Sequence, residues 1–289
     1  MEKKPFAWYG GKATLTPLLV SLLPGHQVYC EVFGGSGALL FGKPLSRIEI
    51  FNDIDSGVVN FFRVLRDPQQ AEALQQLLML TPYSREEYYE CLRHWHQAED
   101  LVEKARRWYC AVMQSMNSSV KSTGWSSSKK PGSNPALKWS NHAASLTGFV
   151  QRLSQVQIDH RDFEQVILAY DSPDTLFYLD PPYLPETRKK SQCYLHEMSA
   201  HDHQRLLKTM TQIQGMAILS GYDHPLYMDA LSGWECQKVE VLCSSESRRG
   251  QKEAIQQTLR TECIWRNPLC VQKSEMATRQ PSLFEEEVS

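Results

Sequence analysis

The first and last parts of the chain carry short apolar runs separated by polar turns that are rich in glycine or proline. Runs of this kind predict buried strands, and helix-compatible segments follow several of them. Strands are predicted at 27–33, 47–52, 156–159, 176–179, 216–220, 234–242 and 254–265. Helices are predicted at 15–23, 38–41, 57–65, 200–210 and after Asp223-His224-Pro225. This alternation of strands and helices is typical of an α/β fold.

The pattern changes in the middle of the chain, where apolar residues recur with helical spacing and strand-like alternation is absent. Helices are predicted there at 69–80, 85–97 and 99–116. The stretch 116–138 that follows is rich in Ser, Gly, Lys and Asn, which favours a flexible hairpin or loop. The middle of the chain therefore differs in organisation from the two parts that flank it.

These patterns predict a discontinuous domain organisation. Residues 1–66 and 156–270 are expected to form one α/β domain. Residues 67–155 are expected to form a mainly helical insertion with a hairpin near 117–138. Residues 271–289 are expected to form a polar tail.

Composition limits the class of protein. The chain has 289 residues, of which 42% are hydrophobic and 22% charged, as in ordinary globular proteins. No run approaches the roughly 18 apolar residues that span a bilayer. The eight cysteines form no Cys-x-x-Cys pair, which argues against a zinc ribbon and favours reduced thiols in a cytoplasm. The net charge of -2 means that any nucleic-acid-binding surface must be a local patch.

The segment Asp180-Pro181-Pro182-Tyr183 directly follows the predicted strand 176–179. Open α/β sheets place their ligands at the carboxyl ends of strands. The motif offers carbonyl and carboxylate acceptors beside a flat ring, and this combination suits a planar group with an exocyclic amine, such as adenine or cytosine. The alternative is an ordinary turn after a strand, with Asp180 as a capping residue.

A glycine-rich turn, Gly34-Gly35-Ser36-Gly37, joins the strand 27–33 to a helix and allows close approach of a nucleotide. It is neither a complete G-x-G-x-x-G motif nor a phosphate loop. Asp53 ends the next strand, where doubly wound folds hold ribose hydroxyls, whereas Asp55 is expected to cap the helix 57–65. A ribose-binding carboxylate without phosphate-binding features indicates a nucleoside cofactor such as S-adenosylmethionine. A plain tight turn is the alternative.

The N-terminal segment Trp8-Tyr9-Gly10-Gly11-Lys12 supplies flat faces and a cation, although a disordered terminus before a surface helix is the alternative. The pairs His94/His96 and His201/His203 are two residues apart and point to different faces of a helix. No spacing resembles a zinc signature, so no metal site is expected.

Taken together, the segments 8–12, 31–37, 52–55 and 180–183 resemble the Dam-like DNA adenine-N6 methyltransferases, in particular the phage-type enzymes. The resemblance extends to about residue 269 and implies a Rossmann-like S-adenosylmethionine-dependent methyltransferase sheet. It implies that residues 67–155 are the inserted target-recognition domain. Double-stranded DNA is the expected partner, with base flipping of the target adenine. We expect a cytoplasmic protein of a bacterial cell or of its phage or prophage.

The resemblance also implies residue roles. The catalytic residues are expected to be Asp180, Pro181, Pro182 and Tyr183. The cofactor-binding residues are expected to be Trp8, Tyr9, Lys12, Glu31, Phe33, Gly34, Gly35, Ser36, Gly37, Asp53, Ile54, Asp162, Phe163 and Asp180. DNA contacts are expected on three polar loops, from Asn117, Ser118, Lys121, Lys129, Lys130, Arg188, Lys189, Arg248 and Arg249. The segment 117–130 does not match the GATC-reading members, so the recognition sequence stays open.

Other functions remain compatible with parts of this pattern. Methylation of cytosine N4 uses the same acceptor chemistry and is the nearest alternative. Protein glutamine methylation is disfavoured because such enzymes carry Asn at the position of Asp180. A nucleotide-dependent oxidoreductase lacks a site for pyrophosphate here. A DNA-binding module without catalysis would not need both cofactor and acceptor motifs.

Overall fold

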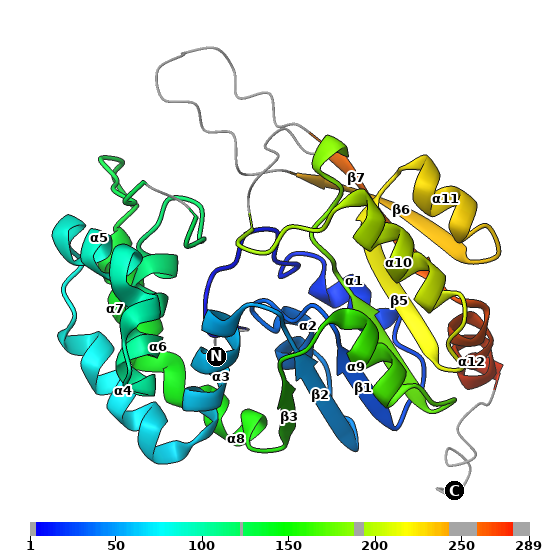
Figure 1. The fold of residues 1–289 in the computed structure, drawn as a ribbon, viewed down its shortest axis with the longest axis horizontal. Helices are drawn as coiled ribbons and strands as arrows, with labels where there is room; N and C mark the ends of the chain where they lie inside the picture. The colour runs from blue at the N-terminus through cyan, green and yellow to red at the C-terminus, as the bar shows by residue number, and fades with distance from the viewer. Residues whose placement is uncertain (1–3, 122–123, 188–193, 243–258, 280–289) are drawn as a thin grey trace, which may run out of the picture.

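The computed structural model describes residues 4–121, 124–187, 194–242 and 259–279 (Figure 1). Its centre is a seven-stranded sheet with the order β3-β2-β1-β4-β5-β7-β6. The strands are β1 (Val28–Glu31), β2 (Ile48–Asn52), β3 (Val156–Asp159), β4 (Thr175–Leu179), β5 (Met216–Tyr222), β6 (Glu235–Leu242) and β7 (Leu259–Arg266). Paired strands are parallel except that β7 runs antiparallel to β5 and β6. The sheet confirms the predicted mixed α/β class.

Burial on both faces explains why the central strands are apolar. All residues of β4 are buried, and β4 pairs with β1 and β5, so that Phe177 lies opposite Cys30 and Ala217. Successive side chains of a strand point to opposite faces. Phe177 accordingly packs in one hydrophobic cluster and Tyr178 in the other.

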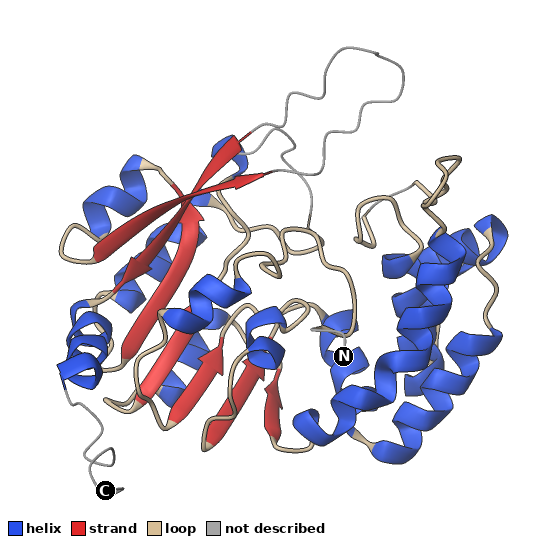
Figure 2. Ribbon diagram, turned by 180° about the vertical axis from the view of Figure 1, so that it is seen from behind, coloured by secondary structure: helices blue, strands red, loops and turns tan. Residues whose placement is uncertain are grey.

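Helices cover both faces of the sheet (Figures 1 and 2). One face packs against α9 (Phe163–Tyr170), α10 (Ala200–Met210) and α11 (Pro225–Ala230). The other face packs against α1 (Thr16–Ser21), α2 (Ala38–Gly42), α3 (Ser56–Arg66) and α12 (Pro268–Arg279). A mostly parallel sheet between two helical layers is consistent with a Rossmann-like methyltransferase fold.

A helical lobe lies beside the β3 edge of the sheet (Figure 2). It consists of α4 (Pro68–Leu80), α5 (Arg85–His94), α6 (Leu101–Met113) and α7 (Pro135–Ser145), and the short α8 (Val150–Leu153) leads back to β3. The lobe shares one hydrophobic cluster with the sheet, because Trp108 and Tyr109 of α6 pack with Phe61 of α3. The Phe61 and Tyr109 rings are stacked with centroids 5.2 Å apart. In the described part of the chain, no helix is long and apolar enough to cross a membrane.

The segment predicted as a hairpin near 117–138 differs from that prediction. Among the described residues, a single antiparallel bridge joins Trp125 of this segment to Ser115, which precedes the segment. Residues 135–138 instead begin α7. The Asn134 side chain accepts a hydrogen bond from the Leu137 backbone N–H (3.1 Å), and Pro135 occupies the first turn. An Asn cap followed by Pro is a strong helix start, which outweighs the polar composition of the segment.

The predicted polar tail is wrong for its first residues, because 271–279 continue α12. Asn267 caps this helix by accepting a hydrogen bond from the Cys270 backbone N–H (3.0 Å), and Pro268 follows the cap. Cys270 is fully buried against the sheet, which anchors the helix. Residues 280–289 lie outside the described part.

Candidate active site

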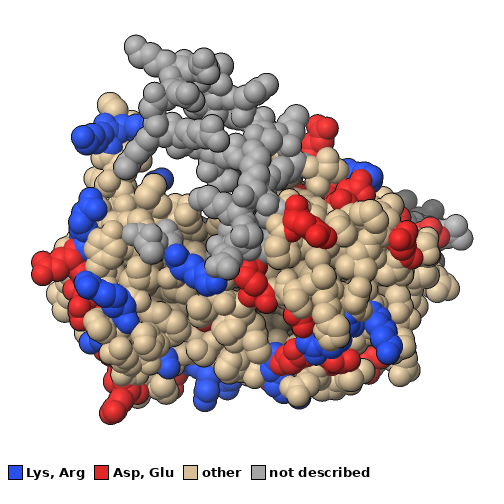
Figure 3. Space-filling view, turned by 45° about the horizontal axis from the view of Figure 1, so that its top comes forward, with Lys and Arg blue, Asp and Glu red and all other residues tan. Residues whose placement is uncertain are grey.

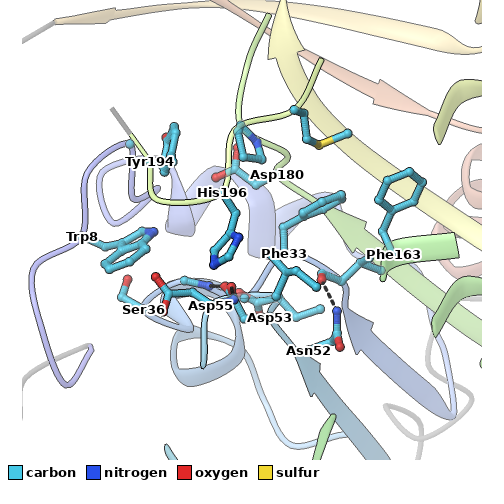
Figure 4. Close-up of a pocket in the computed structure, with 18 of the residues that line it drawn as sticks. Trp8, Phe33, Ser36, Asn52, Asp53, Asp55, Phe163, Asp180, Tyr194 and His196 are labelled. Atoms are coloured by element: carbon cyan, nitrogen blue, oxygen red, sulfur yellow. Dashed lines mark hydrogen bonds between the residues drawn. The ribbon is translucent and has the colours of Figure 1, made fainter. Parts of the chain in front are cut away.

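A cavity of about 450 Å³ opens at the carboxyl ends of β1, β2 and β4 (Figure 4). It brings together most of the residues predicted to bind a cofactor. Those that line it are Trp8, Tyr9, Lys12, Glu31, Phe33, Gly34, Gly35, Ser36, Asp53, Ile54, Asp162, Phe163 and Asp180, together with Pro182. Parallel strands expose their carboxyl ends at one edge, which is why segments far apart in sequence meet here.

The glycine turn forms the floor of the cavity, and its geometry requires glycine. Gly35 and Gly37 have positive φ angles of 50° and 64°. A Cβ on Gly34 would lie 2.1 Å from the Phe51 ring, and a Cβ on Gly35 would lie 2.7 Å from the Trp8 ring. Larger residues would therefore push these rings out of position.

Asp53 joins the glycine turn to the end of β2. Its Oδ2 accepts a hydrogen bond from the Gly35 N–H (2.7 Å), and its Oδ1 accepts one from the Asp55 N–H (2.8 Å). Burial, together with the neighbouring Asp55 carboxylate, raises the pKa of Asp53 to about 7. The Ile54 backbone N–H also stabilises the ionised carboxylate, and because a carboxylate offers about four lone-pair sites, Asp53 can still accept a hydroxyl hydrogen.

Asp55 caps α3, as predicted. Its Oδ1 accepts a hydrogen bond from the Gly57 N–H (2.8 Å), and its side chain is buried. In Figure 4 the His196 ring points into the cavity above Asp55, between Trp8 and Phe33. No role was predicted for His196, which lies in a loop of irregular structure.

Asn52 is a structural residue of the site that the sequence reasoning did not single out. Its Nδ2 donates hydrogen bonds to the carbonyls of Val32 (2.9 Å) and Arg161 (3.1 Å), and its Oδ1 accepts one from the Arg161 N–H (3.0 Å). The amide thus ties together the ends of β1, β2 and β3. The sequence signal that could have identified Asn52 is a polar residue at the end of an apolar strand.

Two phenylalanines form an apolar wall of the cavity. The rings of Phe33 and Phe163 have centroids 5.8 Å apart, and the Arg205 guanidinium lies 4.3 Å from the Phe163 centroid. Asp162 accepts a hydrogen bond from the Glu164 N–H at the start of α9 and forms a bidentate pair with Arg205 (2.8 and 2.9 Å). Its carboxylate therefore fixes this wall in place.

Glu31 lies beneath the turn and is almost fully buried. Its Oε2 accepts hydrogen bonds from the Tyr29 hydroxyl (2.8 Å) and from the Leu40 N–H in α2 (2.9 Å). Burial raises the pKa of Glu31 to about 8 although both hydrogen bonds act in the opposite direction. Glu31 is thus a buried acid that links β1 to α2 at the cavity floor.

At the end of β4, Asp180 forms an ion pair with Lys12, with 2.9 Å between Oδ1 and Nζ. Burial alone would lower the pKa of Lys12, but the carboxylates of Asp180 and Glu262 outweigh burial and raise it. Lys12 therefore remains an ammonium ion at neutral pH. The ion pair joins the N-terminal segment to the end of β4 and places an ammonium group beside the Asp180 carboxylate.

Tyr183 is buried with its hydroxyl donating to Oε2 of Glu262 (2.7 Å). Its ring packs edge-on against Tyr222, with centroids 4.4 Å apart, and the Lys12 ammonium lies 4.7 Å from its centroid. Burial, together with nearby carboxylates, raises the pKa of Tyr183 well above its ordinary value. Glu262 was not predicted, because it was counted only as part of a strand.

The predicted DNA-binding residues are only partly described. Asn117, Lys121, Lys129 and Lys130 are exposed on the loops of the helical lobe, and Ser118 has a positive φ of 51°. Figure 3 shows Lys and Arg side chains along the lobe side of one face, with Asp and Glu more frequent on the opposite side. Arg188, Lys189, Arg248 and Arg249 lie outside the described residues.

Comparison with known proteins agrees with this geometry. Residues 8–253 match the sequence model of the family described as D12 class N6 adenine-specific DNA methyltransferase. Over 276 residues the chain is 25% identical to the Type II methyltransferase M1.LlaDCHI of Lactococcus lactis subsp. cremoris. The aligned region covers 89% of this chain and 95% of that protein.

The chain is also 23% identical over 223 residues to the DNA N-6-adenine-methyltransferase of Escherichia phage P1. That aligned region covers 73% of this chain but 28% of the phage protein. The predicted resemblance is therefore confirmed, and cytosine N4 is not the favoured acceptor. The chain belongs to the D12 class of N6 adenine-specific DNA methyltransferases.

Proposed function

We propose that the cavity binds S-adenosylmethionine with the ribose on Asp53 and the adenine against Phe33 and Phe163. The residues present fit this group. A volume of about 450 Å³ lies within the range of small-molecule sites. The Asp53 carboxylate retains acceptor capacity, and the phenylalanine wall offers an apolar surface to a purine. When bound, S-adenosylmethionine supplies an electrophilic methyl group on a positively charged sulfur.

The acceptor side of the reaction is assigned to the Asp180 motif. Adenine N6 is a poor nucleophile because its lone pair is delocalised into the ring. Among the described contacts, Lys12 engages Oδ1 of Asp180, which leaves Oδ2 for an N6–H donor. A second N6–H would donate to the Pro181 carbonyl. These two hydrogen bonds would draw N6 towards tetrahedral geometry and orient its lone pair, so that Asp180 acts by position and charge.

Adenine N6 is enclosed in the duplex, so the target base must be flipped into the site. Tyr183 would stack on the flipped base, because its ring lies next to Asp180 in the chain and is held firmly by Glu262 and Tyr222. Aromatic side chains are common stacking surfaces for nucleic-acid bases.

We further propose that the helical lobe, within residues 67–155, reads the DNA. The loop that follows α6 is closed by hydrogen bonds from Met116 N–H to the Gly124 carbonyl and from Ser126 N–H to the Gln114 carbonyl, both 2.8 Å. Trp125 packs against Tyr83, and Arg85 lies over its ring. This firm base supports the exposed lysines of the loop, which suit phosphate contacts.

The observation that carries the assignment is the placement of Asp180 and Asp53 on one cavity. The test measures transfer of labelled methyl groups to DNA together with cofactor affinity. Asp180→Ala should abolish N6-methyladenine formation with cofactor affinity within about twofold of wild type, because Asp180 acts on the acceptor. Asp53→Ala should instead weaken cofactor binding. The exposed Asp229→Ala on α11 is the matched control and should behave as wild type. Turnover retained by Asp180→Ala would refute the assignment.

A further inference from the structure

Glu262 is a buried carboxylate at the active site that comes from an antiparallel strand, β7. It lies on β7, the antiparallel strand, opposite Tyr222 of β5. Since β7 runs opposite to its neighbours, its first residues lie at the edge where the parallel strands end. Glu262 is 7% exposed and thereby joins the carboxyl-end cluster formed around Lys12.

The Lys12 cluster consists of Lys12, Asp180, Tyr183 and Glu262. Tyr183 donates to Glu262 at 2.7 Å, and Lys12 lies 2.9 Å from Asp180 and 3.8 Å from Glu262. The Lys12 ammonium also lies over the Tyr183 ring. Glu262 thus contacts both the residue that would stack on the base and the cation that holds the acceptor carboxylate.

The Lys12 cluster places two carboxyl groups beside one ammonium group, because Lys12 lies near both Asp180 and Glu262. Buried charges are costly unless they are paired in this way. During methyl transfer, the N6 lone pair forms the N–C bond and the S–C electrons return to sulfur. The positive charge then lies on N6 until its proton leaves to Asp180 or water. A negative charge near N6 favours this change.

We propose that Glu262 is a positioning residue for methyl transfer. It holds the Tyr183 ring through the hydroxyl and shares Lys12 with Asp180, so that stacking surface and acceptor are fixed relative to each other. The inference rests on the proposed assignment of Asp180 and Tyr183 to the acceptor side. Its effect is expected on the chemical step, because Asp53 and the glycine turn lie outside the Lys12 cluster and Glu262 does not line the cavity, although Lys12 and Asp180 do.

The test compares single-turnover methylation rates, with cofactor and DNA saturating, on a duplex that carries the sequence methylated by the wild-type enzyme. Glu262→Gln keeps an acceptor oxygen for Tyr183 but removes the charge, and its rate should fall about tenfold or more. Cofactor and DNA dissociation constants should stay within about twofold of wild type. Glu240→Gln, on the exposed side of neighbouring β6, is the matched control and should leave the rate unchanged.

A double-mutant cycle separates positioning from general stability. Tyr183→Phe removes the hydroxyl and keeps the ring, and it should slow the rate less in the Glu262→Ala background, where the hydroxyl has already lost its acceptor. A wild-type rate for Glu262→Gln would overturn the inference. A loss confined to melting temperature or cofactor affinity would do the same. Asp180→Ala is measured in parallel: turnover in that variant would refute the proposed acceptor site itself, whatever Glu262 does.

Discussion

Lowering the pH from about 8 to about 6 should weaken cofactor binding about tenfold through Asp53. In the proposed complex the ribose hydroxyls would donate to the ionised Asp53 carboxylate, so binding would favour its deprotonated form. With a pKa of about 7, Asp53 is mostly ionised at the upper pH and mostly protonated at the lower one. The loss of the binding-competent fraction corresponds to about 1.4 kcal/mol. Since burial raises this pKa, an ordinary exposed aspartate would show no change in this window.

The assay is isothermal titration calorimetry with S-adenosylhomocysteine, which binds without turnover. Asp53→Asn is the matched variant: it should bind more weakly, and it should lose the additional pH dependence between about 6 and 8. Other titrating groups, including Glu31 with its raised pKa, remain in both proteins, so the difference isolates Asp53. The reasoning would be refuted if the dissociation constants of wild type and Asp53→Asn changed with pH to the same extent. Proton release on binding below neutral pH gives an independent check.

Three further variants test other parts of the site. Arg205→Ala removes the pair with Asp162 and should weaken cofactor binding severalfold with little change in the saturated rate, as measured by steady-state kinetics. Glu31→Gln should flatten the dependence of the unfolding free energy on pH, as measured by urea unfolding. Because the pKa of Glu31 in the folded protein is about 8, the wild type loses stability as the pH rises from about 4.5 to 8. Lys129→Ala with Lys130→Ala should weaken DNA binding and reduce its logarithmic salt slope by about two.

The controls come from exposed positions elsewhere. Lys208→Ala with Lys273→Ala removes the same charge from α10 and α12 and should leave the salt slope of DNA binding unchanged. An equal effect of both lysine pairs would mean that the loop has no special contact with phosphate. A lower saturated rate with unchanged affinity in Arg205→Ala would contradict its role in the cavity wall. A pH-dependent stability that persists in Glu31→Gln would assign that dependence to another group.

Local sequence patterns predicted much of the fold, because strands, turns and helix caps depend on residues that are close together in the sequence. The strands and the glycine turn followed from apolar runs and Gly34-Gly35-Ser36-Gly37. The capping of α3 by Asp55 followed from its place before a helical pattern. Helix α12 was missed because its polar composition concealed an Asn-Pro start.

The contacts within the Lys12 cluster could not be predicted from the sequence, for a different reason. Sequence patterns show that a strand exists, but they do not show its neighbours or its direction. Glu262 reaches Tyr183 only because β7 is antiparallel and pairs with β5. The partner of Lys12 likewise depends on how the N-terminal loop crosses the ends of β1 and β4. These are long-range consequences of topology.

The hydrophobic cluster shared between α3 and α6 bears on how the enzyme's specificity can be re-engineered. Exchange of the whole helical lobe with that of a relative would cut through the stack of Phe61 on Tyr109 and the packing of Phe6 on Trp108. The chimaera would then carry mismatched halves of a single core. On the proposed assignment of DNA reading to the lobe, a graft limited to residues 126–133 leaves that core intact, whereas a longer graft would also replace Val120, which packs against it.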